Sequence, residues 1–219
     1  MNSNLESNYQ KILTAIDGRA SLLAVSKKQP LEKLKVLYEL GHRDFGENYA
    51  QELVQKAEQM KAQGYDQCRW HFIGHLQKNK INALLPHVSM IHSVDSIKIS
   101  GDLNTRQLKK HPSSKLECFL QINISSESSK GGVKLNQVEN ALKEINSMEG
   151  LKLVGLMCLP DPRRAKEAFE TMQKLKQTYS SDHHPIQLSM GMSQDFEMAI
   201  DYGSDWVRIG TELFGARPG

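Results

Sequence analysis

Short apolar, β-branched stretches alternate along the chain with longer stretches whose apolar residues recur at three- and four-residue spacings. The short stretches predict eight strands, at Leu22–Ser26, Arg43–Phe45, Trp70–Ile73, Met90–Ser93, Glu117–Ile122, Leu151–Met157, Gln187–Ser189 and Trp206–Ile209. The longer ones predict helices, at Leu5–Ile16, Leu31–Leu40, Ala50–Gln63, Val138–Ser147 and Arg164–Tyr179. Strands that alternate with helices are typical of βα units in a parallel sheet.

The number of units and the chain length together favour a closed barrel over an open doubly wound sheet. The chain has 219 residues, and a (β/α)8 barrel takes ~250 residues, with a lower limit of about 200. No linker, low-complexity tract or sequence repeat divides the chain. We therefore expect an α/β protein, a single (β/α)8 TIM barrel that forms one domain over residues 1–219.

Composition and charge exclude several classes of function. The formal net charge is only +3 and aromatic residues make up 6% of the chain, which argues against a nucleic-acid partner. Three cysteines, far apart and odd in number, suggest neither a disulfide framework nor a zinc knuckle. The N-terminus lacks the pattern of a signal peptide, and no window reaches the ~18 apolar residues that cross a bilayer. We expect a cytoplasmic protein with no membrane contact.

Lys27 is the first candidate for chemistry, because the active site of a barrel lies at the C-terminal ends of its strands. Alternation along the first strand places Lys27 on the same face as Leu23 and Val25. A lysine that enters a dry cavity has a lowered pKa, so its free amine can attack an aldehyde. The alternative is a solvated lysine in the loop before Pro30, and Lys28 is assigned that role.

The last two strands supply candidates for an anion site. Arg208 shares parity with Trp206 and Gly210, and Gly210 and Thr211 begin a short helix where backbone amides and a hydroxyl can bind phosphate. The loop after the seventh predicted strand contains Ser193, a good N-cap for a helix over 194–200. An ordinary cap without a ligand is the alternative for Ser193. Barrels commonly bind phosphate with these two loops.

Other candidate sites are weaker. His71 and His75 have the spacing of metal ligands on a helix, but they straddle a predicted strand and a glycine turn, so we expect no metal site. The run that contains Lys130 lacks the remaining residues of a phosphate loop. We find no GxSxG elbow and no carboxylate pair suited to glycoside hydrolysis.

Eight ordered motifs closely resemble the YggS/PROSC family of pyridoxal phosphate homeostasis proteins, over nearly the whole chain. They are AVSKKQP (24–30), FGENYAQE (45–52), WHFIGHLQKNK (70–80), HSVDS (92–96), QINISSESSKGG (121–132), GLMCLP (155–160), LSMGMSQDFEMAI (188–200) and VRIGTELFGAR (207–217). The resemblance implies the barrel domain of alanine racemases without their second β domain. One departure is His75, where many members have proline.

The resemblance also implies a cofactor, pyridoxal 5'-phosphate (PLP), and its ligands. Lys27 would carry it as a Schiff base, and Arg208 would face the pyridine nitrogen. The phosphate would lie against Ser193, Gly210 and Thr211, and Asn48 would lie near the ring. A permanent guanidinium charge beside the ring nitrogen keeps it unprotonated, which weakens the electron sink of the cofactor.

The leading hypothesis is therefore a PLP-binding protein without turnover and without catalytic residues, which buffers the cofactor and delivers it to PLP-dependent apo-enzymes. A small amino-acid racemase or decarboxylase is the alternative, although it needs a second acid–base group; Tyr49 is the nearest tyrosine by motif, and we expect no catalytic role for it. A cofactor-free Schiff-base aldolase that uses Lys27 and a nucleic-acid-binding role complete the alternatives. Without a partner domain, we expect a monomer.

Overall fold

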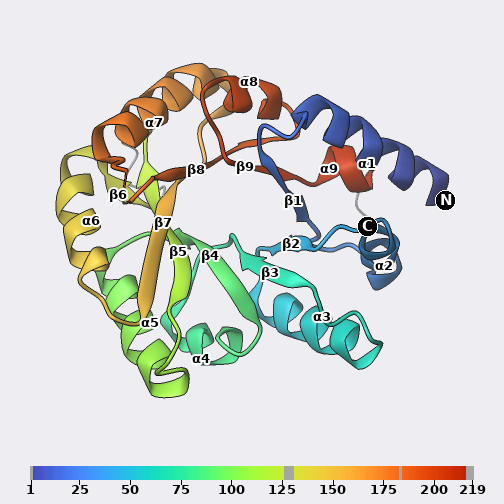
Figure 1. Ribbon diagram of the computed structural model, residues 1–219, viewed down its shortest axis with the longest axis horizontal. Coiled ribbons are helices and arrows are strands. Elements are labelled where there is room, and N and C mark those ends of the chain that lie inside the picture. Colours follow the sequence, from blue (N-terminus) through green and yellow to red (C-terminus); the bar gives the residue numbers. More distant parts are fainter. Residues whose placement is uncertain (1, 126–130, 183, 216–219) are drawn as a thin grey trace.

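Eight parallel strands close into a barrel, and the helices surround it (Figure 1). The computed structural model describes residues 2–125, 131–182 and 184–215. The barrel strands are β1 (Ser21–Val25), β2 (Asp44–Glu47), β3 (Arg69–Phe72), β4 (Val88–Val94), β5 (Leu116–Asn123), β7 (Leu151–Cys158), β8 (Gln187–Met192) and β9 (Trp206–Ile209). The predicted (β/α)8 barrel is confirmed.

Closure comes from two pairings. Ser21 of β1 lies opposite Trp206 of β9, and Met90 of β4 lies opposite Glu117 of β5, so that neither end of the strand order is an open edge. The helices are α1 (Asn2–Ile16), α2 (Leu31–Glu39), α3 (Ala50–Ala62), α4 (Ile81–Leu84), α5 (Ile97–Lys110), α6 (Val138–Asn146), α7 (Ala165–Tyr179), α8 (Phe196–Asp201) and α9 (Thr211–Phe214). No helix in the described part of the chain is long and apolar enough to cross a bilayer.

The sequence did not predict three elements, β6, α4 and α5. β6 (Val133–Lys134) is a two-residue strand that pairs with the end of β5. Helix α5 escaped prediction because its buried face includes Ser100 and Gln107 beside Leu103, so the apolar periodicity is weak.

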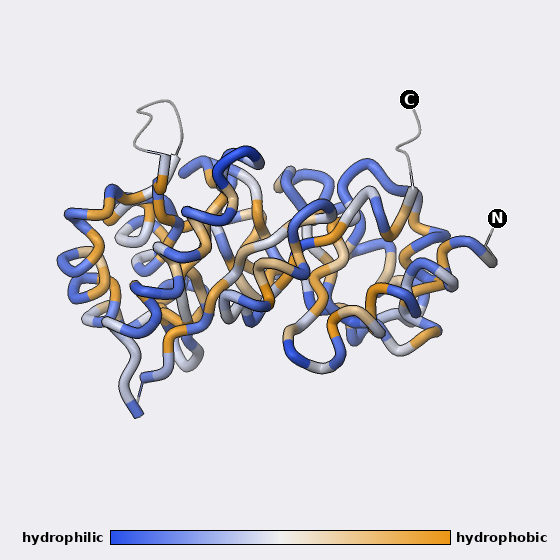
Figure 2. The backbone as a smooth tube through the Cα atoms, turned by 90° about the horizontal axis from the view of Figure 1, so that it is seen from above, coloured by the Kyte–Doolittle hydropathy of each residue, from blue (hydrophilic) through white to orange (hydrophobic). Residues whose placement is uncertain are grey.

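Alternation along the strands separates two environments. Outward residues such as Phe45 and Trp70 pack against the helices in one large hydrophobic core. Inside the barrel, Met90, Phe119 and Met157 form a separate small apolar cluster. In the tube view of Figure 2, hydrophobic segments run through the body of the molecule, and many loops at its rims are hydrophilic. Beside these apolar groups, the barrel interior also contains buried polar side chains, among them His71, His92, Ser189 and Arg208.

A helix follows β8 as predicted, but the predicted start at residue 194 with Ser193 as the cap is wrong. Helix α8 begins at Phe196, its N-cap is Asp195, and no side chain caps it. The Asp195 carboxylate instead accepts a hydrogen bond from the Met192 amide (2.6 Å), which closes a tight turn before the helix. Ser193 is thereby left in the loop at the end of β8.

Gly155 of β7 is predicted to tolerate no side chain, whereas Gly101 of α5 should accept one. A Cβ at Gly155 would lie 2.1 Å from the Gln187 carbonyl oxygen, and a Cβ at Gly101 would meet nothing within 4 Å. Gly155→Ala should lower the free energy of unfolding by roughly 1–3 kcal/mol, as overpacking does. Gly101→Ala should raise it by about 0.5–1 kcal/mol because alanine favours the helix. Urea unfolding of both variants checks this, and equal effects would contradict the close approach of β7 and β8.

Candidate functional site

A cavity of about 540 Å³ opens at the C-terminal ends of the strands. All six residues that the sequence marked as cofactor ligands line it, from four separate loops and strand ends: Lys27, Asn48, Ser193, Arg208, Gly210 and Thr211. Val25, Ile73, Leu159 and Met192 add apolar surface, and Asp195 and Glu212 add two carboxylates. The cavity thus combines an amine, a buried cation, hydroxyls and backbone amides.

Lys27 reaches the cavity because β1 alternates as its sequence predicts. Leu23 is fully buried inside the barrel, Val25 lines the cavity, and Lys27 follows them on the same face, half-buried. Lys28 is exposed, and its backbone is left-handed (φ 58°), which turns the chain away from the barrel. The two adjacent lysines therefore occupy different environments.

The end of β1 is held from behind by a buried ion pair. Lys56 of α3 donates to the Glu47 carboxylate (2.8 Å) and to the Ser26 carbonyl oxygen (2.6 Å), and the Ser26 hydroxyl donates to the same carboxylate (2.7 Å). Burial raises the pKa of Glu47 to about 7, although Lys56 acts in the opposite direction. This arrangement fixes the backbone one residue before Lys27.

Asn48 brings an unsatisfied acceptor to the cavity wall. Its side-chain oxygen is buried and has no hydrogen-bond partner among the described residues. The adjacent backbone is packed against Gly74, where a Cβ would lie 1.9 Å from the Asn48 carbonyl oxygen. A buried acceptor left unpaired costs about 1–3 kcal/mol, which a donor from a bound ligand would recover.

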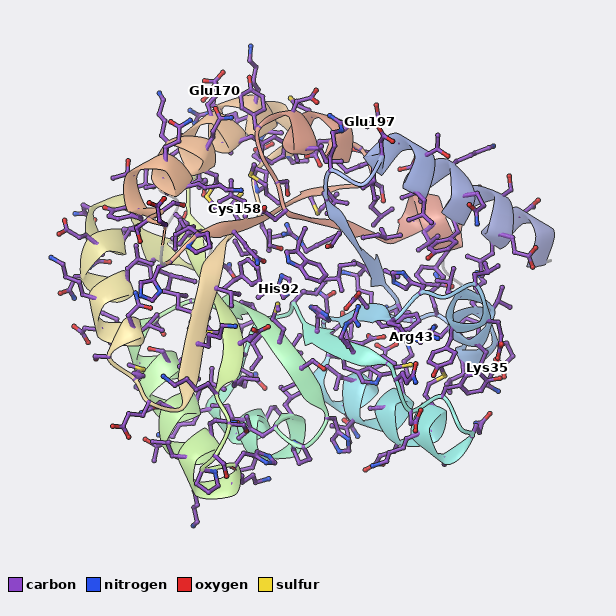
Figure 3. The ribbon with its side chains drawn as sticks, in the orientation of Figure 1. Lys35, Arg43, His92, Cys158, Glu170 and Glu197 are labelled. Carbon is purple, nitrogen blue, oxygen red and sulfur yellow. The ribbon has the colours of Figure 1, made fainter. Side chains whose placement is uncertain are left out.

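Arg208 closes the cavity from below. Its guanidinium is buried and donates to the Ser189 hydroxyl oxygen (2.8 Å) and to the Cys158 carbonyl oxygen (2.8 Å). Burial lowers its pKa, yet an arginine remains a cation in proteins. Cys158, labelled in Figure 3, is the last residue of β7. The cavity floor therefore carries a fixed positive charge.

The loops after β8 and β9 meet at the other wall. The Glu212 amide approaches the Ser193 hydroxyl oxygen at 3.5 Å, which links the two loops. Gly210 is the N-cap of the short helix α9, and Thr211 is its first residue. Hydroxyls and first-turn amides thus lie together, as the sequence predicted for these positions.

Several residues fall outside this cavity. Tyr49 is exposed and lines a different hollow, and His75 is exposed and lies 3.2 Å from Asp95, so it is separate from His71 inside the barrel. No group of three or more His, Cys, Asp or Glu side chains in the described part of the chain is arranged to hold a metal ion. Lys130 lies outside the described residues.

Sequence reasoning missed the polar groups beneath Arg208. The Ser189 hydroxyl contacts His92 Nδ1 (2.9 Å), and His92 is fully buried at the centre of the barrel (Figure 3). Burial lowers the pKa of His92 well below its usual value, and the neighbouring His71 and Arg208 add to this effect. The available signal was a histidine at an inward position of a predicted strand, which pairs with Ser189 only once the barrel closes.

Comparison with known proteins identifies close relatives. The family model described as "Alanine racemase, N-terminal domain" matches residues 2–218. The chain is 38% identical to proteins named pyridoxal phosphate homeostasis protein from Mus musculus (94% of this chain, 79% of that one) and from Escherichia coli (90% and 86%). A solved structure of PipY from Synechococcus elongatus, with PLP bound, is similar with a TM-score of 0.85 and 26% identity, over 96% of this chain and 100% of that one.

The lowered pKa of His92 predicts a loss of stability in mild acid. The unfolded chain takes up a proton below about 6.5 that folded His92 refuses, so the free energy of unfolding falls as the pH falls, by at most ~1.4 kcal/mol per pH unit for this proton. His92→Gln should make the dependence shallower by one proton, as measured by urea unfolding between pH 5 and 7. His111→Gln, at an exposed position, controls for the substitution. Parallel curves for His92→Gln and the wild type would contradict the prediction.

Proposed function

The chain belongs to the alanine racemase N-terminal domain family and, within it, to the pyridoxal phosphate homeostasis proteins, and from this membership we propose that it binds PLP in the cavity at the barrel mouth. The observation that carries the proposal is the convergence of all six expected ligands on one cavity. Residues 1–219 would act as one PLP-binding unit.

The cavity residues fit the groups of PLP. When bound, PLP supplies an aldehyde that condenses reversibly with a lysine amine, and Lys27 would hold it as a Schiff base. Ser193, Gly210 and Thr211 would bind the phosphate, since hydroxyls and helix-start amides suit a dianion. Arg208 would face the ring nitrogen, and the unpaired oxygen of Asn48 would accept a donor from the bound group.

We propose a carrier function and not catalysis. The fixed charge of Arg208 disfavours protonation of the ring nitrogen, so the electron sink that carbanion chemistry needs is weak. Tyr49, the tyrosine nearest by motif, does not line the cavity. The proposed role is to buffer PLP and to deliver it to PLP-dependent apo-enzymes, in the cytoplasm and as a monomer.

The absorption spectrum tests the proposal directly. Wild-type protein with added PLP should develop a visible Schiff-base band, and borohydride should then attach a pyridoxyl group to Lys27, detected by peptide mass. Lys27→Ala should lose both signals, and Lys28→Ala, whose side chain is exposed, should retain them. A wild type without the band after reconstitution would sink the proposal. Turnover in an amino-acid panel would instead favour the racemase alternative.

The hydroxyls of Ser193 and Thr211 should distinguish PLP from pyridoxal, which lacks the phosphate. Ser193→Ala combined with Thr211→Val should weaken PLP at least about tenfold, since hydrogen bonds to charged groups contribute roughly 1.5–3 kcal/mol. The affinity for pyridoxal should change little, as measured by equilibrium dialysis. Thr178→Val on the exposed face of α7 is the control. Equal losses for the two ligands would place the phosphate elsewhere.

A further inference from the structure

A continuous chain of hydrogen-bonded side chains runs through the interior of the barrel, beginning at Arg208. The contacts are Arg208 Nη1 to Ser189 Oγ (2.8 Å), Ser189 Oγ to His92 Nδ1 (2.9 Å), His92 Nε2 to His71 Nδ1 (2.9 Å) and His71 Nε2 to Asp44 Oδ1 (3.1 Å). Five strands, β9, β8, β4, β3 and β2, contribute one residue each. We call these five residues the barrel chain.

The barrel chain spans the barrel from its mouth to its opposite edge. Arg208 lines the cavity at the C-terminal ends of the strands, whereas Asp44 is the first residue of β2. Beyond it, Arg69, the first residue of β3, pairs with the Asp44 carboxylate (2.6 and 2.5 Å). The five members are 0–8% exposed, but the Arg69 side chain is 57% exposed. Solvent therefore reaches this line of groups at the far edge.

Aromatic rings isolate the two histidines from other polar partners. Phe119 stacks on His92 with ring centroids 4.5 Å apart, and Trp206 lies 5.0 Å from the His71 ring. Among the described residues, the other ionisable groups in electrostatic contact with the barrel chain lie at its two ends: Cys158 and Asp195 act on Arg208, and Asp44 interacts with Arg69, His42 and Tyr9. Within the described part of the chain, the side chains of the histidine pair hydrogen-bond only along the barrel chain.

With both histidine rings neutral, donor and acceptor rules fix the direction of every bond. Arg208 can only donate, so the Ser189 oxygen accepts from it, and the Ser189 hydroxyl donates to His92 Nδ1. His92 then carries its proton on Nε2 and donates to His71 Nδ1, and His71 donates from its own Nε2 to the Asp44 carboxylate. Reversal of the neutral rings would set two acceptors, His71 Nε2 and Asp44 Oδ1, against each other at 3.1 Å.

Arg208 depends on this arrangement because both of its hydrogen bonds go to neutral oxygens. A buried guanidinium needs its acceptors held in place, since an unpaired buried charge costs several kcal/mol. The Ser189 hydroxyl is oriented only while His92 Nδ1 accepts a hydrogen bond from it. His92 Nδ1 can accept only while the His92 proton is on Nε2, where it is donated to His71 Nδ1, and His71 in turn donates from Nε2 to Asp44. The carboxylate that orients Arg208 thus lies four hydrogen bonds away.

We propose that Asp44, His71, His92 and Ser189 are positioning residues, which act through one fixed set of tautomers to hold the Arg208 guanidinium at the floor of the cofactor cavity. This inference rests on the proposed function, because the group that Arg208 would meet is the pyridine ring of PLP. It adds a functional element at the edge of the barrel opposite the site.

The tautomers of the apo-protein give the first test, which needs no cofactor and uses variants only to assign the signals. In long-range ¹H–¹⁵N spectra of histidine-labelled wild type, the neutral rings of His71 and His92 should both carry their proton on Nε2. Assignment uses His71→Gln and His92→Gln. A proton on Nδ1 of either neutral ring, or a charged ring, would overturn the proposal.

Variants of Asp44 test the transmission to the cofactor site. Asp44→Ala removes the terminal acceptor, so the His71 and His92 tautomers should become mixed, the Kd for PLP should rise about tenfold, and the visible band should shift. Asp44→Asn keeps an acceptor and should restore the tautomers and most of the affinity. Glu117→Ala, at another carboxylate near the same edge that pairs with Lys152 (2.8 Å), should change neither signal.

Each result has one meaning. Altered tautomers in Asp44→Ala with unchanged PLP affinity and band would overturn the positioning role. If Asp44→Ala fails to fold, Ser189→Ala breaks the barrel chain with the loss of one atom and should also weaken PLP about tenfold; unchanged binding there would overturn the proposal. A wild type that binds no PLP contradicts the proposed function instead. The tautomer spectrum of the apo-protein then still tests the hydrogen-bond directions of the barrel chain.

Discussion

A guanidinium that is buried away from water must be hydrogen-bonded, because the desolvation of an unpaired ion costs several kcal/mol. Arg208 meets this demand with the Ser189 hydroxyl oxygen and the Cys158 carbonyl oxygen, both neutral. The first of these acceptors needs a partner for its own proton, and that partner is His92. The polar interior of the barrel, unusual beside its small apolar cluster of Met90, Phe119 and Met157, follows from this one buried charge.

Side chains on the two faces of the strands support different parts of the cavity. Inward residues connect Arg208 to Asp44, whereas the outward Ser26 and Glu47 engage Lys56 of α3 and fix the backbone that leads to Lys27. Because successive residues of a strand point in opposite directions, Ser26 can be held from outside while Lys27 projects inside. Under the proposed function, the amine and the cation that PLP meets are thus positioned by independent networks.

Local alternation was enough to predict much of this arrangement. The barrel follows from eight short apolar stretches, and the parity of Leu23, Val25 and Lys27, like that of Trp206 and Arg208, can be read within five residues of sequence. The pairing of His71 with His92 could not be read in this way, since the two residues are 21 positions apart and meet only when β3 and β4 pair side by side. The start of α8 was mispredicted because the Asp195 carboxylate accepts the Met192 amide, a bond that outweighs the ordinary preference for Ser193 as a cap.

Under the proposed function, the fixed charge of Arg208 also bears on why this barrel would hold PLP without using it for amino-acid chemistry. An enzyme that needs the electron sink must supply a proton to the ring nitrogen, and a group that supplies protons must itself be able to lose one. Arg208 cannot supply this proton, because its guanidinium stays charged. Its two hydrogen bonds go to the neutral oxygens of Ser189 and Cys158 and not to a base that could remove a proton. His92 cannot do it either, since burial and the adjacent cation keep the ring neutral. Under the proposed function, a fixed donor at the ring therefore favours the orientation of the cofactor over its activation, which is the property that a reversible carrier requires.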